Sequence, residues 1–267
     1  MKRIIISDND DFDALFPFCL SENLGIELQS FWNPTRPELY PTRIEYQLEK
    51  IKTIDFIAFH GPFGDLNCGS YDPMIQEVSR DRMLLGYQTA CQLKATHIVF
   101  HHGYVPHTSP PKNWVPRFVQ FWKSFLVGKL ENVYFHLENM LELSPDIMIE
   151  TIDTISDQRI SACLDVGHAH CNSTTPILNW IEKLGNRIGY VHIHDNDGTS
   201  DQHLAIGEGN IPFIDVCNAL NERSPDAIWT LETQTNGIKK SYNWLVQNGF
   251  VSKGLKERKK RLNSGST

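Results

Sequence analysis

Histidines and carboxylates collect where apolar runs of this chain stop and loops begin. In chain order they are His60, His101, Glu138, Asp165, His168, His192, Asp201, His203 and Glu232. Imidazole nitrogens and carboxylate oxygens are ligands that zinc and manganese take in proteins. A single histidine at a strand end is more often a hydrogen-bonded structural residue than a ligand. The same coincidence at one strand end after another indicates a shared metal site, so these residues predict a metal-dependent enzyme.

Two glutamates and one Asp–His pair carry most of this argument. Glu138 and Glu232 each end an apolar run, in FHLE and IWTLE. A buried carboxylate without a partner costs several kcal/mol, so each needs a cation, either a metal ion or a lysine or arginine. In LDVGHAH, Asp165 stands three residues before His168, which lets both side chains reach the same mouth from a strand-to-helix turn.

The stretch HIHDNDGTSDQHLAIGEG is the most specific sign of a ligand site in the chain, because it holds several types of candidate ligand. His192 and His194 share one face of a strand because strand side chains alternate. One of them can therefore be a ligand while the other supports it. Asp201 and His203 bring a further carboxylate and imidazole from the following loop.

The elements that would position these residues alternate between strand and helix. Short β-branched runs lie at 4–7, 26–31, 56–60, 97–101, 133–138, 161–165, 189–194 and 228–232, and helix-like segments include 73–93, 114–126, 175–184, 212–220 and 239–247. This alternation predicts a single α/β domain, a (β/α)8 TIM barrel over residues 1–251. An open doubly wound sheet would carry a Gly-rich turn after its first strand, where this chain reads DNDDFD.

Composition narrows the class of protein further. The chain has 267 residues, 40% of them hydrophobic, and a formal net charge of −7. Its acidity argues against broad nucleic-acid binding, although a local basic patch stays open. With six cysteines but no Cys-x-x-Cys pair, no signal segment and no membrane-length apolar run, we expect a cytoplasmic protein with free thiols. Residues 252–267 are basic and then Ser/Gly-rich, which predicts a flexible tail.

With these residues in place, the chain resembles the xylose isomerase-like TIM-barrel superfamily, which holds sugar isomerases and epimerases, inosose-processing enzymes and endonuclease IV. The motifs HLENM, LDVGHAH, HIHDNDG with DQH and GEG, and LET carry the resemblance over nearly the whole chain. The superfamily binds metal through a Glu, an Asp, a His and a Glu from its last four strands. These positions correspond to Glu138, Asp165, His192 and Glu232. His192 is preferred to His194 because the pattern His-x-x-acid falls on His192 and Asp195.

The resemblance to endonuclease IV adds further candidate ligands of metal or substrate. The matching positions are His60, His101, His168, Asp201 and His203. The resemblance therefore implies one to three Mn²⁺ or Zn²⁺ ions. One difference argues against a role in DNA repair. Endonuclease IV is expected to have an Ala-Gly-Gln-Gly segment after the glutamate that corresponds to Glu138, whereas this chain reads NMLELSPD there.

The resemblance implies a divalent-metal-dependent isomerase or epimerase acting on a sugar, sugar phosphate or related polyol. Proton transfer next to a metal-polarised carbonyl would be its chemistry, with Glu138 and Glu232 as base and acid. Two alternatives stay open: a multinuclear phosphoesterase like endonuclease IV, and a barrel that binds sugar or metal without turnover.

Overall fold

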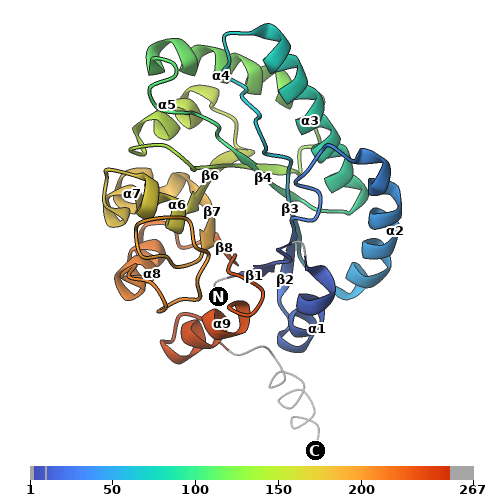
Figure 1. Cartoon of the computed structure of the whole chain (residues 1–267), viewed down its shortest axis with the longest axis vertical. Coiled ribbons are helices and arrows are strands. Elements are labelled where there is room, and N and C mark those ends of the chain that lie inside the picture. Colours follow the sequence, from blue (N-terminus) through green and yellow to red (C-terminus); the bar gives the residue numbers. More distant parts are fainter. Residues whose placement is uncertain (1–2, 10, 253–267) are drawn as a thin grey trace, which may run out of the picture.

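The computed structural model describes residues 3–9 and 11–252, in which eight parallel strands form one closed barrel in chain order (Figure 1). The ring closes where β1 pairs with β8. The strands are β1 (Ile4–Ser7), β2 (Gly25–Leu28), β3 (Ile57–His60), β4 (His97–His101), β5 (Tyr134–Glu138), β6 (Ile160–Asp165), β7 (Ile188–Ile193) and β8 (Ile228–Leu231). The predicted (β/α)8 barrel is confirmed, and the open doubly wound sheet is excluded.

Helices surround the strands and cover their outer faces. They are α1 (Phe12–Glu22), α2 (Tyr40–Lys50), α3 (Pro73–Gln92), α4 (Pro111–Leu126), α5 (Asp146–Ile155), α6 (Val166–Asn172), α7 (Ile177–Leu184), α8 (Phe213–Arg223) and α9 (Ile238–Gln247), with short 3-10 turns η1 (Pro37–Leu39), η2 (Ile51–Thr53) and η3 (Gly185–Arg187). In Figure 1, α9 lies beside α1, and the rings of Phe18 and Tyr242 meet there with centroids 5.6 Å apart. The last helix thus closes the outer layer against the first.

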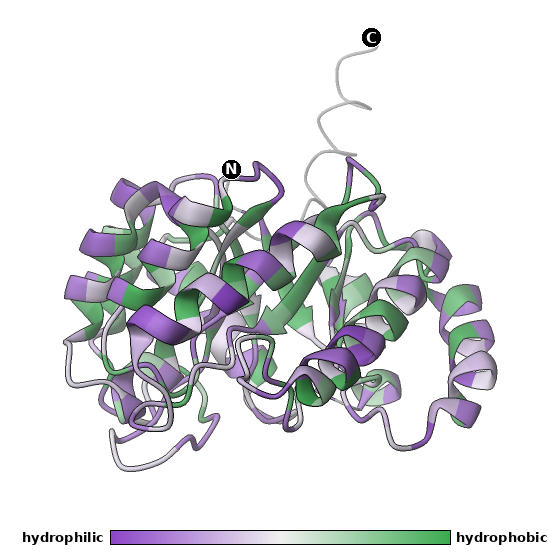
Figure 2. Ribbon diagram, turned by 90° about the horizontal axis from the view of Figure 1, so that it is seen from above, coloured by the Kyte–Doolittle hydropathy of each residue, from purple (hydrophilic) through white to green (hydrophobic). Residues whose placement is uncertain are grey.

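The main core lies between strands and helices. Hydrophobic segments gather on the strands and on the inner sides of the helices, while much of the outer helix surface is hydrophilic (Figure 2). In α4 the buried aromatic residues are Trp114, Phe118, Phe121, Trp122 and Phe125, and the rings of Trp114 and Phe118 stack at 4.5 Å. This aromatic stripe is part of the core, as its helical spacing predicts.

Alternation along the strands builds the inside of the barrel. A small cluster of buried residues fills it: Ile5, Ala58, Val99, Cys163, Tyr190 and Ile228. Two residues further along the same strands come Ser7, His60, His101, Asp165, His192 and Thr230. Because residues two apart share a face of a strand, this polar set points into the carboxyl-end mouth of the barrel.

Some element boundaries differ from the predictions. β2 ends at Leu28, so residues 29–31 of the predicted strand 26–31 belong to a loop. The reason is a contact with Asp8, whose carboxylate accepts from the backbone N–H of Gln29 at 2.8 Å and from the hydroxyl of Ser30 at 2.7 Å. His194 and Glu232 likewise lie one residue beyond β7 and β8. The structure also contains four helices that were not among the predicted segments, namely α1, α2, α5 and α6.

Three expectations concern the chain as a whole. The cysteines, all within the described ranges, form no disulfide. No helix of residues 3–9 and 11–252 is long and apolar enough to cross a membrane. Of the predicted tail 252–267, residues 253–267 lie outside the described residues, and the boundary at 251 stays a prediction.

His97 and His136 form a buried pair at the amino end of the barrel, and this pair predicts that the folded protein loses stability in acid. Nδ1 of His97 lies 2.8 Å from Nε2 of His136, and the two rings are parallel. Burial, reinforced by Arg3, lowers the pKa of His97 to about 4, against about 6.5 in an unfolded chain. Folding therefore excludes a proton from this ring. The resulting stability is complete above pH ~6.5 and is lost as the pH falls toward about 4.

We expect His97 to account for about 2 kcal/mol of the free energy of unfolding lost between pH ~7.5 and pH ~5. Urea unfolding of the wild type and His97→Gln at both pH values measures this loss. Glutamine can still donate to His136, and it does not titrate. The variant should lose less stability than the wild type by that amount, whereas equal losses would mean that His97 titrates normally.

Candidate metal centre

Four of the predicted ligands converge at the barrel mouth, and we call them the tetrad: Glu138, Asp165, His192 and Glu232. One ligand atom of each lies within 4.8 Å of the others. Nδ1 of His192 lies 3.1 Å from Oε1 of Glu138 and 2.9 Å from Oε2 of Glu232. All four residues are buried, with at most 6% of their surface exposed. The glutamates come from β5 and from just past β8, so they approach this point from different sides.

Glu138 also belongs to a second group, with His60 and His101. Nε2 of His60 lies 3.0 Å from Oε2 of Glu138, and Nε2 of His101 lies 3.4 Å from the same oxygen. Oε1 of Glu138 faces the tetrad. The two oxygens of one carboxylate thus serve different groups, an arrangement that can bridge two cations.

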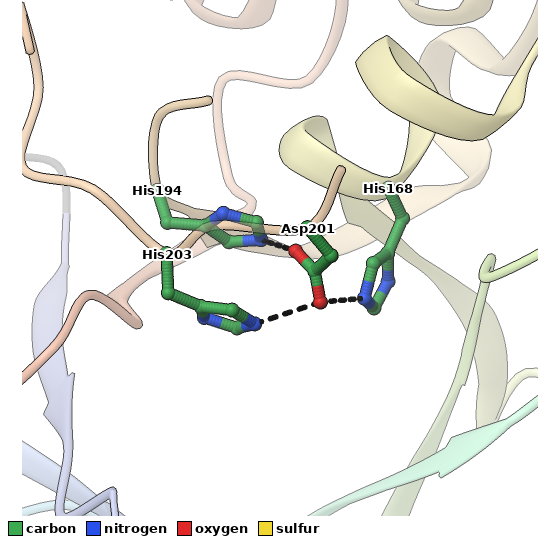
Figure 3. Close-up of side chains that lie close together, drawn as sticks. All are labelled: His168, His194, Asp201 and His203. Atoms are coloured by element: carbon green, nitrogen blue, oxygen red, sulfur yellow. Dashed lines mark hydrogen bonds and ion pairs between the residues drawn. The ribbon is translucent and has the colours of Figure 1, made fainter. Parts of the chain in front are cut away.

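A third group, the loop cluster, consists of His168, His194, Asp201 and His203 (Figure 3). Oδ2 of Asp201 lies 3.2 Å from Nε2 of His168 and 3.0 Å from Nε2 of His203. Oδ1 of Asp201 lies 3.6 Å from Nε2 of His194, whose ring stacks on His203 at 3.9 Å. The predicted additional ligands therefore do not form one group, because they divide between this cluster and the pair around Glu138.

The loop after β7 carries Asp201 and His203 back over the mouth. Asp195 and Leu204 form an isolated antiparallel bridge at its base. The carboxylate of Asp195 also accepts from the backbone N–H of Gly207 at 2.8 Å and of Ile211 at 3.2 Å. Gly207 has a φ of +88°, a conformation that favours glycine. These contacts fix the return of the loop.

Ring tautomers show which nitrogens are available to a cation. In three histidines Nδ1 must donate, because its partner is a backbone carbonyl, which can only accept. The acceptors are the carbonyls of Gly61, Asn139 and Glu232, at 2.9, 2.9 and 2.7 Å from Nδ1 of His60, His168 and His203. Each Nε2 faces a carboxylate instead. Nε2 of a neutral ring would repel that carboxylate, so a proton or a metal ion must lie between them.

The shifted pKa values of these side chains support the same conclusion, that a proton or a metal ion lies between imidazole and carboxylate. Burial disfavours the charged form of Glu138, but the imidazoles of His192 and His101 outweigh it and hold the pKa of Glu138 well below its usual range. Burial opposes protonation of His203, yet Asp201 and Glu232 raise its pKa to about 9. Burial likewise opposes protonation of His168, whose pKa Asp165 and Asp201 raise well above its usual range. Carboxylates and imidazoles together form a site that attracts cations.

The carboxylates of this site have no lysine or arginine as a partner among residues 3–9 and 11–252. Within the described part of the chain, no Lys or Arg nitrogen lies within 4.0 Å of a carboxylate oxygen of Glu138, Asp165 or Glu232. The salt bridge that the sequence left open as an alternative for Glu138 and Glu232 is therefore absent from this part. Oε2 of Glu232 is buried and accepts no hydrogen bond of acceptable geometry there.

A cavity of about 250 Å³ opens above the three groups. It is lined by Asn9, Gln29, Trp32, His60, Phe63, His101, Glu138, Met140, His168, Asp201, His203 and Glu232. The ring of Phe63 stacks on Trp32 at 5.4 Å and on His101 at 4.5 Å, which makes one wall aromatic. A hollow of about 300 Å³ at the amino end of the barrel contains no histidine. The cavity at the mouth is thus the candidate functional site.

Sequence reasoning missed Glu27 and Gln29, two polar residues next to the tetrad. Glu27 lies inside β2, fully buried, with Oε2 3.2 Å from Nε2 of His192. Gln29 follows β2 and donates to Glu27 and Glu232. His194 was expected to support a neighbouring ligand, and its Nε2 contacts Asp165 at 3.0 Å, while the same ring also belongs to the loop cluster. A lone glutamate between Ile26 and Leu28 was the available signal, because a charge inside an apolar strand needs a partner.

The fold and the site define a (β/α)8 barrel whose carboxyl-end mouth gathers residues able to bind metal. The chain belongs to the xylose isomerase-like TIM barrel family, whose model matches residues 22–248. The predicted family is confirmed.

Proteins related in sequence align with most of this chain. The uncharacterized protein MJ1311 of Methanocaldococcus jannaschii is 29% identical over 209 residues, which span 73% of this chain and 71% of that protein. Fructoselysine 3-epimerase of Escherichia coli O157:H7 is 22% identical over 172 residues, 61% of this chain and 62% of the enzyme.

Solved structures agree in fold. A D-tagatose 3-epimerase-like protein superposes with a TM-score of 0.75 at 26% identity, over 92% of this chain and 96% of its own. A protein from Thermus thermophilus, in a crystal soaked with ZnCl2, has a TM-score of 0.72 at 22% identity, over 92% of this chain and 98% of its own. Because its sequence identity is low, the similarity to the Thermus thermophilus protein shows only that the two proteins share a fold.

Proposed function

We propose that this protein is a divalent-metal-dependent epimerase or isomerase that acts on a carbohydrate by proton transfer next to a carbonyl. The observation that carries the proposal is the tetrad, in which two buried glutamates from different sides of the barrel meet at His192. Relatives named fructoselysine 3-epimerase and D-tagatose 3-epimerase-like protein support a carbohydrate substrate.

The residues present fit a divalent ion such as Zn²⁺ or Mn²⁺. The tetrad offers three carboxylates and one imidazole nitrogen, a donor set that suits both metals. The buried Oε2 of Glu232, which accepts no hydrogen bond within the described residues, is suited to bind such an ion. Cys163 also lies near Glu138 and His192, but burial raises the pKa of its thiol well above the usual value, so we do not propose it as a ligand.

The chain's own residues can move the proton. A bound ion would polarise the carbonyl and hydroxyl oxygens of the sugar. We propose that Glu138 and Glu232 flank the reacting carbon, so that one carboxylate takes its proton and the other returns a proton to the opposite face. Nδ1 of His192 lies 3.1 Å from Glu138 and 2.9 Å from Glu232, where it would hold the ion together with both glutamates. Trp32 and Phe63 offer an apolar ring surface on which the C–H face of a sugar can pack.

A multinuclear phosphoesterase is the second candidate, and the two additional groups favour it. His60 and His101 beside Glu138, together with the loop cluster, bring the number of donor groups at the mouth to three. In such a site the ions would lie about 3.5–4 Å apart. We propose these groups as additional binding positions for metal or substrate.

The test combines a metal count with two assays on the same protein. We expect at least one metal ion per chain, and conversion of at least one member of a ketose panel in the presence of Mn²⁺, followed by NMR. Cleavage of an abasic-site duplex without epimerisation, with two or three ions per chain, would instead favour the phosphoesterase. Stoichiometric metal with neither activity would favour a barrel that binds without turnover.

A further inference from the structure

Glu27 is a buried carboxylate in a strand that contributes no residue to the tetrad. It lies in β2 with none of its surface exposed. Its Oε2 lies 3.2 Å from Nε2 of His192 and also accepts from the hydroxyl of Tyr190. Because this oxygen accepts from the Tyr190 hydroxyl, we take Nε2 of His192 as the donor of the second hydrogen bond to it. That leaves Nδ1 of His192, which faces Glu138 and Glu232, as the nitrogen available to a ligand.

The other oxygen of Glu27 reaches a second member of the tetrad. Its Oε1 accepts from the side-chain amide of Gln29 at 3.2 Å. The same amide nitrogen donates to Oε1 of Glu232. This leaves Oε2 of Glu232 directed toward His192. Glu27 is therefore joined to His192 directly and to Glu232 through one intervening side chain.

We propose that Glu27 is a positioning residue that sets the ring tautomer of His192 and the orientation of Glu232 for metal binding. The proposal rests on the tetrad being the metal site of the proposed function. Carboxylates that accept the second ring N–H of a ligating histidine fix its orientation and raise its basicity, and their loss commonly weakens metal binding about 10–100-fold. Among the described residues, Glu27 is the hydrogen-bond acceptor that faces Nε2 of His192.

If Glu27 only stabilised the fold, then loss of any comparable buried carboxylate should weaken metal binding to the same extent. A second buried His–Glu pair provides the comparison, because Oε1 of Glu142 lies 2.8 Å from Nδ1 of His102, with both side chains fully buried. Neither residue belongs to a group able to hold metal or lines the mouth cavity. Glu142 makes no direct contact with the tetrad, although it accepts from the backbone N–H of Met140 at 2.7 Å. Glu142→Gln therefore removes a buried carboxylate of the same kind and measures the general cost of such a loss, including any effect through the loop after β5.

The experiment compares wild type, Glu27→Leu, Glu27→Gln and Glu142→Gln by zinc titration and by NMR of histidine ring protons. In metal-free protein we expect a slowly exchanging Nε2–H signal from His192 in the wild type and in Glu142→Gln, and its loss in Glu27→Leu. Glutamine can still accept this hydrogen bond through its amide oxygen, so Glu27→Gln should keep the signal. Zinc affinity should fall about 10–100-fold in Glu27→Leu and less in Glu27→Gln.

Each outcome decides one of the two proposals. Equal zinc affinity in the wild type and both Glu27 variants would overturn the positioning role. An equal loss of affinity in Glu142→Gln would also overturn it, since the effect would then be general destabilisation. If Glu27→Leu does not fold, Glu27→Gln decides, because a lost ring signal there would contradict the proposed acceptor. A wild type that binds no zinc but keeps the slow signal would refute the metal-dependent function while the contact stands.

Discussion

Replacing Glu138 or Glu232 by glutamine should lower turnover by at least about 10²-fold, the usual worth of a positioned acid or base. Glutamine keeps the size of the side chain but cannot take a proton from carbon. Each glutamate is also a proposed ligand, so the variants must be assayed at saturating metal with the bound metal measured. Glu208→Gln is a suitable control, because Glu208 is an exposed residue that pairs with Lys240.

Solvent-deuterium exchange at the substrate carbon is the sensitive measurement for these variants. It reports removal of the proton even where no net conversion follows. One glutamate should be essential for exchange from each epimer, according to the face of the carbon that it serves. Exchange that persists in both single variants, with metal retained, would mean that another residue is the base, although the metal site could still stand.

The strand ends were predictable because two simple regularities meet there. Parallel strands in a barrel bring their carboxyl ends to one mouth, and alternation decides which side chains point inward. His60, His101, Glu138 and Asp165 each end a strand that the sequence marks by an apolar run. Local sequence contains both signals, so the fold and most of the mouth residues follow from it.

Glu27 was missed because the end of β2 is set by a tertiary contact. Asp8, which follows β1, takes the hydrogen bonds of Gln29 and Ser30, so the strand stops at Leu28. The predicted strand in the sequence continues to Phe31, which hides the true end. A search limited to the ends of apolar runs therefore passes over both Glu27 and Gln29.

The different environments of the two histidines at the end of β7, His192 and His194, also depend on distant residues. His192 and His194 share a strand face in the sequence, but only His192 belongs to the tetrad, while Nε2 of His194 lies 3.0 Å from Oδ1 of Asp165. His194 lies with Asp201 and His203 because the loop returns and is fixed by Asp195. A chain segment that folds back in this way leaves no local pattern from which its partner could be predicted.

Removal of divalent metal should destabilise the protein substantially. Buried carboxylates of the tetrad would then depend on protonated imidazoles alone for compensation. If free metal exceeds its dissociation constant about 1,000-fold, binding adds about 4 kcal/mol to the free energy of unfolding. For a chain of this size that corresponds to a shift of roughly 10 °C in the unfolding temperature. Thermal scans of chelated protein, before and after Zn²⁺ or Mn²⁺ is restored, measure the shift.

Asp165→Asn separates this metal effect from helix capping. The carboxylate of Asp165 accepts from the backbone N–H of His168 at 2.7 Å and so caps α6, a role that asparagine also performs well. The variant should therefore keep its helix but lose most of the thermal response to metal. Asp72→Asn is the matched control, because Asp72 caps α3 in the same way and is exposed. A full metal response in Asp165→Asn would exclude Asp165 as a ligand. An unchanged unfolding temperature after verified metal removal would exclude a metal ion bound among the buried carboxylates.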